Sequence, residues 1–410
     1  MTNHLPTPWA TGAEQVDWVA AEPGEGPPMS RRARMRSQGP YSASVPPMIS
    51  DLQVTVSPQI AAEAAEAANA LTRFDARTAG ELGGAELGPL AAVLLRTESA
   101  SSSQIEQITA GAKELALASI GESDRPNARL VAANVSAMER AIALSQQITV
   151  EGIVDIQALL LGPSDPEHVG IRKEAVWIGP RASTPHTASF VAPQHERVPG
   201  LLDDLVAFTR RTDVEPMVQT ALAHAQFATI HPFTDANGRT GRALAQACLR
   251  SYGVIQQVTM PVSAGLLSAV EDYYEALTAY RAGDLDPIVA AFSSAAFHAV
   301  GNGERLVRDL LEIRARWRTS LRARSDASVW RALPVVMSQP ALTVNVLAER
   351  IGISVTAAQT AIDQMVAAEV LALANANRRN RVWVAREVLD ALDEFAKRAG
   401  RRRLPGQRSH

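Results

Sequence analysis

The sequence has very little cysteine, few aromatic residues and no long apolar run. Cys248 is the only cysteine in 410 residues, which excludes an intrachain disulfide and a cluster of thiolate metal ligands. The N-terminus lacks a basic stretch followed by an apolar run, so we expect no signal peptide. No apolar run approaches the roughly 20 residues that cross a bilayer. These absences lead us to expect a cytoplasmic protein with no membrane partner.

A strong charge of one sign is also missing. The formal net charge of −3 gives no overall attraction to nucleic acid or to an anionic membrane. Aromatic residues make up 5% of the chain and hydrophobic residues 46%, and alanine is abundant. This composition favours a mainly α fold, and the length is sufficient for two or three domains with a buried core.

Composition and periodicity divide the chain into five parts. Residues 1–57 are rich in Pro, Gly and Ser and predict a loosely packed arm, which carries Arg31, Arg32, Arg34 and Arg36. Residues 58–302 are mainly helical, with a short extended piece within 168–193. A connecting helix over 303–325 leads to a separate unit at 326–395 and a basic tail at 396–410.

The unit at 326–395 has the pattern of a winged helix-turn-helix. Helices are expected at 328–337, at 344–351 after the capping residue Thr343, and at 355–368, followed by two strands around the loop 375–381. The presumed recognition helix contains no Lys or Arg among its polar residues, which are Thr356, Gln359, Thr360, Asp363 and Gln364. Phosphate attraction would have to come from the loop or the tail, namely from Arg378, Arg379, Arg381, Lys397, Arg398, Arg401, Arg402, Arg403 and Arg408. DNA binding and protein docking or dimerisation both remain open for this unit.

Residues 231–242 concentrate the chemistry of the chain. A core helix capped by Asp213 is predicted to run up to His231, where Pro232 prevents its continuation. A second helix is predicted from about Asn237 to about Ser251. The loop Thr234–Gly238 therefore lies at a helix N-terminus, where free backbone N–H groups favour a phosphate.

The side chains of this segment suit nucleotidyl or phosphoryl transfer. Arg239 and Arg242 are three residues apart on the first turn, where an incoming polyphosphate would compensate their charge. Asp235 is a hard oxygen ligand for Mg²⁺ or Mn²⁺ shared with phosphates. His231, with a reference pKa near 6.5, can be neutral at pH 7 and accept a proton from an attacking hydroxyl.

Residues 231–242 closely resemble the signature of the Fic family, His-Pro-Phe-x-Asp/Glu-Gly-Asn-Gly/Lys-Arg-x-x-Arg. The single departure is Ala236, which stands where Gly is usual and could restrict the backbone around the anion. The likeness covers about residues 95–300, and it includes His224, Phe227 and Ile230 before the signature and Tyr273, Tyr274, Leu277, Gly283, Asp284 and Pro287 after it.

The resemblance implies adenylylation, the transfer of AMP from ATP to a hydroxyl of a target protein that the sequence does not identify. By matching positions, His231 would be the base and Asp235 would hold the metal. The other expected ATP-binding residues are Thr234, Ala236, Asn237, Gly238, Arg239, Arg242, Tyr273 and Tyr274. The piece with Val176, Trp177 and Ile178 resembles the family's β-hairpin flap, whose edge would dock the target by main-chain pairing. Its alternative is an ordinary edge hairpin.

Residues 101–107 resemble the inhibitory motif of the family, Ser/Thr-x-x-x-Glu-Gly/Asn. Ser102 and Glu106 are in register with that motif, whereas Gln107 replaces the usual Gly or Asn. A Glu106 carboxylate paired with Arg242 would occupy the place of the γ-phosphate. We therefore expect autoinhibition by Glu106.

The fold expected from these features is mainly α, with a Fic-type helical core, a small β flap and a C-terminal winged helix-turn-helix. Two other activities of the same fold stay open, removal of AMP and transfer of a phosphoryl group. A different class of function is a DNA-binding regulator that uses the Fic core as a nucleotide sensor. Because the family often dimerises, a homodimer is one further expectation.

Overall fold

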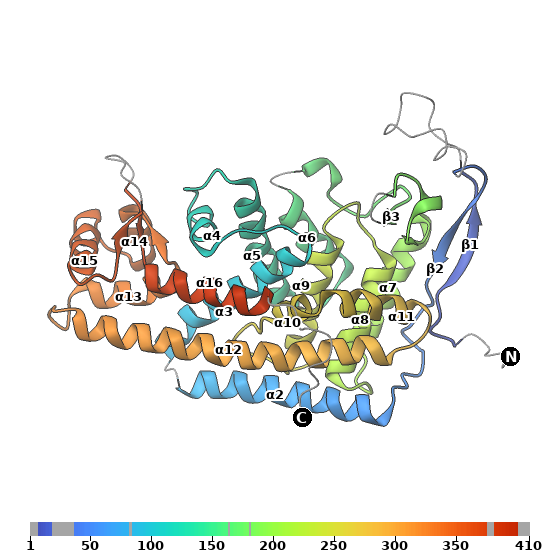
Figure 1. Cartoon of the computed structure of the whole chain (residues 1–410), viewed down its shortest axis with the longest axis horizontal. Coiled ribbons are helices and arrows are strands. Elements are labelled where there is room, and N and C mark those ends of the chain that lie inside the picture. Colours follow the sequence, from blue (N-terminus) through green and yellow to red (C-terminus); the bar gives the residue numbers. More distant parts are fainter. Residues whose placement is uncertain are drawn as a thin grey trace.

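The computed structural model describes residues 7–18, 37–81, 84–162, 165–179, 182–374 and 381–400, and they form a mainly helical protein (Figure 1). The Arg residues predicted to lie in the arm at 31–36, Arg378 and Arg379 of the wing, and Arg401, Arg402, Arg403 and Arg408 of the tail lie outside these ranges. Within them, no helix is both long enough and apolar enough to span a bilayer.

The helices in chain order are α2 (Pro58–Glu81), α3 (Gly84–Ile105), α4 (Ala112–Ala118), α5 (Pro126–Leu144), α6 (Val150–Leu161), α7 (Val198–Thr209), α8 (Pro216–Ile230), α9 (Asn237–Ser251), α10 (Val262–Ser268), α11 (Val270–Arg281), α12 (Asp286–Ser320), α13 (Ser328–Ser338), α14 (Val344–Ile351), α15 (Val355–Ala367) and α16 (Arg386–Gly400). Within the described ranges, three short 3₁₀ helices lie at Pro166–His168, Pro185–Thr187 and His195–Arg197. The strands are β1 (Gly12–Val16), β2 (Tyr41–Val45), β3 (Trp177–Ile178), β4 (Phe190–Val191), β5 (Ala341–Leu342), β6 (Ala372–Leu373) and β7 (Trp383–Val384). They pair antiparallel as β1-β2, β3-β4 and β5-β7-β6.

Helix α8 lies at the centre of the core, and nearly all of its residues are buried. Its N-terminus is capped by Glu215, which accepts a hydrogen bond from the Val218 N–H at 2.8 Å. The prediction that Asp213 caps this helix is therefore wrong, since Asp213 forms an exposed ion pair with Arg211 instead. The predicted start and end of α9 are both correct.

The described part of the N-terminal segment is packed, in contrast to the loose arm that its composition indicates. Strands β1 and β2 form a hairpin, and Trp9 and Ile49 are buried in the main core. The Asp204 carboxylate accepts hydrogen bonds from the backbone N–H groups of Ile49 and Ser50. These contacts come from residues far along the chain, which local composition does not reveal.

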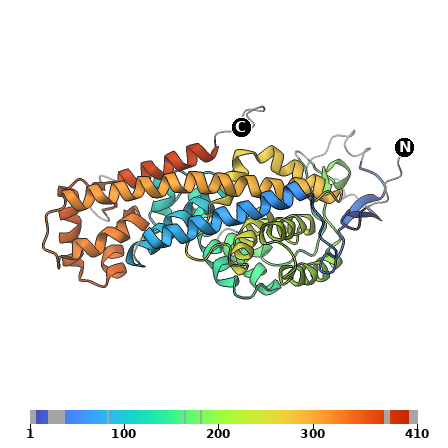
Figure 2. The same cartoon turned by 90° about the horizontal axis from the view of Figure 1, so that it is seen from below.

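Helix α12 is one continuous helix of 35 residues. It begins in the core that contains α8 and ends next to the C-terminal unit, so the expected connecting helix at 303–325 corresponds to its second half. Helices α2 and α12 lie side by side along the molecule (Figure 1 and Figure 2). Of the two, α12 extends to the C-terminal unit, where it contacts α13.

The C-terminal unit has the helices and strands that its sequence predicts. The Thr343 side chain caps α14, and β5, β7 and β6 form a small sheet. The description of this unit as a winged helix-turn-helix stays a prediction. The unit is not separate, because α16 returns along α12 and packs against α3, α4 and α10 (Figure 1). One hydrophobic core includes residues from both parts.

Candidate active site

The backbone of the loop between α8 and α9 is strained at two residues and is fixed by hydrogen bonds. His231 ends α8 with φ of 51°, and Ala236 precedes α9 with φ of 66°. The Asn237 side chain closes the loop, since its amide donates to the Phe233 carbonyl at 2.8 Å and its oxygen accepts from the Phe233 N–H at 3.0 Å. The Asn237 amide therefore fixes the loop rather than projecting from it.

The imidazole of His231 is partly exposed by surface area, although protein groups surround most of it. This burial, together with the positive charges of Arg172 and Arg281, lowers the pKa of His231 to about 4. The ring is therefore neutral at pH 7 and able to accept a proton. This agrees with the protonation state that the sequence analysis requires of a base.

Arg172 anchors the turn that carries His231, and nothing in the sequence pattern singled it out. Its side chain is 3% exposed. Its guanidinium donates to the carbonyls of His231 at 2.8 Å and Pro193 at 2.6 Å, and also to Glu174 and Ile230. Its backbone N–H donates to the Pro232 carbonyl at 3.0 Å. Arg172 therefore connects the base of the flap to the His231 turn through backbone acceptors, which carry no side-chain signal.

The first turn of α9 forms a surface that is suited to an anion. The N–H groups of its first residues have no acceptor within the helix. Arg239 is 3% exposed, and its Nε and Nη1 atoms have no hydrogen-bond partner in the described structure. Burial lowers the pKa of Arg239, against the opposing effect of Asp235 and Glu106. A buried guanidinium with unused donors at a helix N-terminus fits a polyphosphate.

Glu106 lies on this surface, directly after α3. A methyl group added at Gly238 would lie 1.9 Å from Oε1 of Glu106, so the carboxylate rests against the Gly238 backbone. Oε1 is 2.9 Å from Nη2 of Arg242. The Arg242 guanidinium also donates to Ser102 Oγ at 2.9 Å and to the Ser102 carbonyl at 2.7 Å. The expected contact between the inhibitory motif and the second arginine is thus present.

The Glu106–Arg242 ion pair is unequally buried. The Arg242 side chain is 2% exposed and the Glu106 side chain 38%. Burial acts to lower the pKa of Arg242, but Glu106 and the neighbouring Tyr273 outweigh it, and the net shift is upward. Because the carboxylate is partly exposed, it can leave the pair without opening the core.

Both departures from the family patterns fall at backbone positions with positive φ. Ala236 has φ of 66° and Gln107 has φ of 62°. Glycine adopts this region without a steric penalty, and Asn tolerates it better than most residues. This explains why Gly, or Gly and Asn, is usual at the two positions. It also means that this chain carries a small conformational cost at each.

Glu98 is a second buried residue that the sequence analysis did not identify. It lies two turns before Glu106 on α3, and its carboxylate accepts from Ser263 N at 2.9 Å and from Ser263 Oγ at 2.6 Å. Burial raises the pKa of Glu98 to about 7. This contact ties α3 to α10.

The two tyrosines expected to bind ATP occupy different surroundings. Tyr273 is buried, with its hydroxyl 2.7 Å from Nε2 of His224. Tyr274 is 47% exposed. Its hydroxyl is 3.5 Å from the Ile105 carbonyl, next to Glu106. Only Tyr274 presents an accessible ring at the site.

The predicted flap is the hairpin β3-β4, and its strands are only two residues long. Trp177 packs against Trp18 with ring centroids 5.9 Å apart. Ser44 in β2 donates to the Val191 carbonyl of β4 at 2.6 Å. Ile178 is 37% exposed, whereas the Val176 carbonyl accepts from the Ala192 N–H. The N-terminal hairpin thus supports the flap.

The metal ligands that the chain itself supplies are few. No group of three or more His, Cys, Asp or Glu side chains within the described ranges could hold a metal ion. Asp235 is exposed at the site, and Thr234 lies beside it, with its hydroxyl 3.5 Å from the His168 carbonyl. A single carboxylate fits an ion that is held mainly by the phosphates of a bound nucleotide.

Comparison with known proteins gives consistent results. Residues 147–249 match the model of the Fic/DOC family. The protein adenylyltransferase fic-1 of Caenorhabditis elegans is 31% identical over 144 residues, which cover 35% of this chain and 26% of that protein. The protein adenylyltransferase Fic of Nematostella vectensis is 29% identical over 150 residues, which cover 36% of this chain and 32% of that protein. The chain therefore matches about a quarter to a third of the length of these relatives.

A solved structure extends the likeness of the fold. The crystal structure of a Fic family protein from Desulfovibrio desulfuricans aligns with a TM-score of 0.51 and 21% identity, covering 81% of this chain and 97% of that one. The loop, the helices around it and the family match coincide on the same residues. Residues 147–249 of this chain form a Fic domain.

Proposed function

We propose that this chain is a protein adenylyltransferase that transfers AMP from ATP to a hydroxyl side chain of a target protein and is autoinhibited by Glu106. The observation that carries the proposal is the Glu106 carboxylate at the N-terminus of α9, paired with Arg242 at 2.9 Å. An acidic side chain already occupies a surface suited to phosphate. The names of the relatives in Caenorhabditis elegans and Nematostella vectensis support the same activity.

The proposed reaction is a displacement at the α-phosphorus of ATP. The target hydroxyl oxygen forms the new bond to phosphorus while the bond to the oxygen bridging the α- and β-phosphates breaks, and pyrophosphate leaves. The hydroxyl proton passes to the neutral imidazole of His231. Arg172 holds the His231 turn in place, so the base does not have to be ordered when the substrate binds.

The phosphates would be held by groups that are in place before ATP arrives. The N–H groups at the start of α9, from Asn237 and Gly238, face the anion, and Arg239 supplies its unused donors. Asp235 would hold Mg²⁺ or Mn²⁺ together with the phosphates, and the ion would neutralise their charge. Thr234 and the exposed ring of Tyr274 lie at the rim.

Inhibition follows from competition for one guanidinium. Arg242 donates three hydrogen bonds to Ser102 and Glu106. ATP can reach the arginine only if the carboxylate leaves, and otherwise its phosphates take a position that is unsuited to in-line attack. The flap hairpin would then dock a target segment along β3, which is paired with β4 on one side only in the described sheets.

Label transfer tests the reaction type. Glu106→Gly and Glu106→Gly/His231→Ala are incubated with α-³²P-ATP and, in parallel, with γ-³²P-ATP. We expect label from the α-position only, in the single variant and not in the double variant. Label from the γ-position alone would identify a phosphotransferase instead. Release of AMP from a target that already carries it, with no transfer from ATP, would identify a de-AMPylase.

DNA binding by the C-terminal unit is the competing function, and the exposed face of α15 gives it little support. Gln359 and Asp363 on that face hydrogen bond to each other at 2.8 Å, and α15 contains no Lys or Arg. A mobility-shift experiment with random duplexes decides the matter. A homodimer stays a prediction from the resemblance, and sedimentation tests it.

A further inference from the structure

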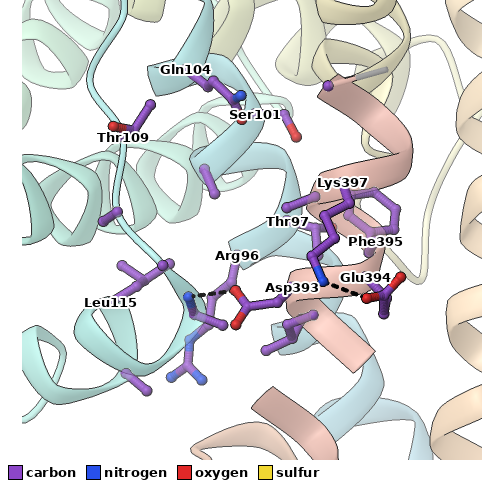
Figure 3. Close-up of a pocket in the computed structure, with 18 of the residues that line it drawn as sticks. Arg96, Thr97, Ser101, Gln104, Thr109, Leu115, Asp393, Glu394, Phe395 and Lys397 are labelled. Atoms are coloured by element: carbon purple, nitrogen blue, oxygen red, sulfur yellow. Dashed lines mark hydrogen bonds and ion pairs between the residues drawn. The ribbon is translucent and has the colours of Figure 1, made fainter. Parts of the chain in front are cut away.

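The C-terminal helix α16 and the inhibitory helix α3 enclose an open cleft that the proposed reaction does not use. Its volume is about 760 Å³, and its third wall is the segment from Thr109 to Ala116 (Figure 3). Sites for small molecules usually have about 300–1,000 Å³. None of the residues 231–242 lines it. The cleft is therefore a site distinct from the ATP site.

Helix α3 presents one face to this cleft and another to the ATP site. Arg96, Ser101 and Gln104 line the cleft. Ser102 and Glu106 contact Arg242 on the other side. Successive residues of a helix point about 100° apart, which accounts for the two faces. A change in the cleft thus acts on the same helix that carries the inhibitory contact.

The loop after Glu106 is the second link between the two sites. Thr109, Ala110 and Gly111 line the cleft and are separated from Glu106 by only two residues. The loop leads into α4, whose N-cap residue Gly111 has no side chain that could accept a capping hydrogen bond. Asp393 of α16 takes that role, because its Oδ1 accepts from the Ala112 N–H at 3.0 Å (Figure 3). A residue of the C-terminal helix therefore holds the loop that follows Glu106.

The charge of the lining favours a cation. Asp390 and Asp393 are three residues apart on α16, so they share a face. Arg96 donates to the Ser338 carbonyl and the Gln339 side chain, and Lys397 is paired with Glu394 at 2.6 Å. Glu394, Asp393 and Asp390 all raise the pKa of Lys397, and these three carboxylates outnumber the two cations of the lining, Arg96 and Lys397. The apolar lining includes Leu115 and Phe395.

We propose that this cleft binds a small organic cation with an apolar body, and that binding weakens the Glu106–Arg242 contact. The cation pairs with Asp390 and Asp393, and it competes with the Ala112 N–H for the Asp393 carboxylate. Loss of that cap loosens the loop 107–111 and the end of α3. The effect on AMP transfer rests on the proposed function, whereas binding and loosening do not.

A tethered charge tests the proposal without knowledge of the natural ligand. The variant Gln104→Cys is labelled with a trimethylammonium-ethyl or a sulfonatoethyl methanethiosulfonate, which attach groups of similar size and opposite charge. The native Cys248 is buried, and burial raises the pKa of its thiol to about 12, so it stays unlabelled. Thr356→Cys, exposed on α15, is the matched control.

Amide hydrogen exchange of residues 107–112 is the first measurement. We expect the cationic adduct at position 104 to accelerate exchange about fivefold, the size of one lost capping contact. The anionic adduct, and both adducts at position 356, should leave exchange unchanged. Equal effects of the two charges at position 104, or no effect of either, would overturn the proposal. In Asp393→Ala the difference between the two adducts should disappear, and its persistence would also count against the proposal.

AMP transfer is the second measurement. The cationic adduct at position 104 should raise self-labelling of a protein that retains Glu106, and it should add nothing in Glu106→Gly. If unmodified Glu106→Gly transfers no AMP, the proposed function has failed, and hydrogen exchange still decides whether the cleft responds to a cation. If Glu106→Gly is active while the adducts change neither labelling nor exchange, only the cleft proposal fails.

Discussion

The two ends of the loop 231–242 are held in different ways. At the His231 end, the side chains of Arg172 and Asn237 bond to backbone groups of the loop, the flap and the end of α8. At the other end, Arg242 is bonded to α3, through Ser102 and Glu106. The first set of bonds does not compete with a ligand, whereas the second occupies the anion surface. The comparison indicates that the His231 turn is held whether or not a ligand is bound, whereas a ligand at the start of α9 would have to displace the contact between Glu106 and Arg242.

The largest effect should come from removing the base. In the Glu106→Gly background, His231→Asn should lower the rate of AMP transfer by about 10²–10⁴-fold. The base acts in its neutral form, so the rate should rise with pH through the His231 pKa of about 4 and then stay level. Initial rates from acidic to neutral pH measure both effects. A rate that still rises steeply between about pH 6 and 7, where an ordinary histidine titrates, would show that the pKa of His231 is not lowered.

Loss of the anchor behind the base should have the next largest effect. Arg172→Met removes four hydrogen bonds to backbone carbonyls. In the Glu106→Gly background we expect kcat to fall about 10–100-fold through misplacement of His231, with little change in KM for ATP. The control is Arg197→Met, which breaks an exposed ion pair with Glu14. A rise in KM with unchanged kcat would contradict a positioning role.

A smaller effect is expected at the phosphate end. Ser102→Ala removes one of the bonds that hold Arg242, at 2.9 Å, and leaves the bond to the Ser102 carbonyl. Self-labelling with Glu106 intact should rise about 2- to 10-fold. Ser103→Ala is the control on the same helix, because the Ser103 hydroxyl bonds to Ser99 and Asn134 and not to Arg242. An equal rise in both variants would point to a general weakening of α3.

The smallest effect concerns the loop backbone itself. Ala236 has φ of 66°, so Ala236→Gly should raise the free energy of unfolding by about 1 kcal/mol. Ala243→Gly, in the middle of α9, should lower it by a similar amount, about 0.5–1 kcal/mol. Urea unfolding of both variants measures the difference. Destabilisation by both would mean that the conformation of Ala236 costs nothing.

Sequence reasoning succeeded where the signals are local. The bounds of α9, the cap at Thr343 and the helices of the C-terminal unit follow from capping residues and apolar spacing. The contact of Glu106 with Arg242 followed from two motifs of one family. Arg172 could not be predicted from the sequence, because it bonds to backbone carbonyls that only the fold brings together. The packing of the N-terminal hairpin could not be predicted for a related reason, since its partners in the flap lie more than 100 residues away along the chain.

The length of α12 and the packing position of α16 could not be predicted from the sequence either. Residues 286–302 and 303–320 have different compositions, but nothing in either interrupts the helix. Helix α16 is strongly amphipathic, yet the pattern does not say that its apolar face meets α3 and α12. The sequence predicts a connecting helix and a separate unit, whereas the structure has one continuous helix α12 and one hydrophobic core shared by the two parts.

The most direct test of the account compares initial rates of self-labelling from α-³²P-ATP in the unmodified chain and in Glu106→Gly. Because one coupling contact typically changes an equilibrium about 5- to 150-fold, we predict a rise within that range. Equal rates in the two proteins, with label detected in both, would contradict the claim that Glu106 controls access of ATP to Arg242.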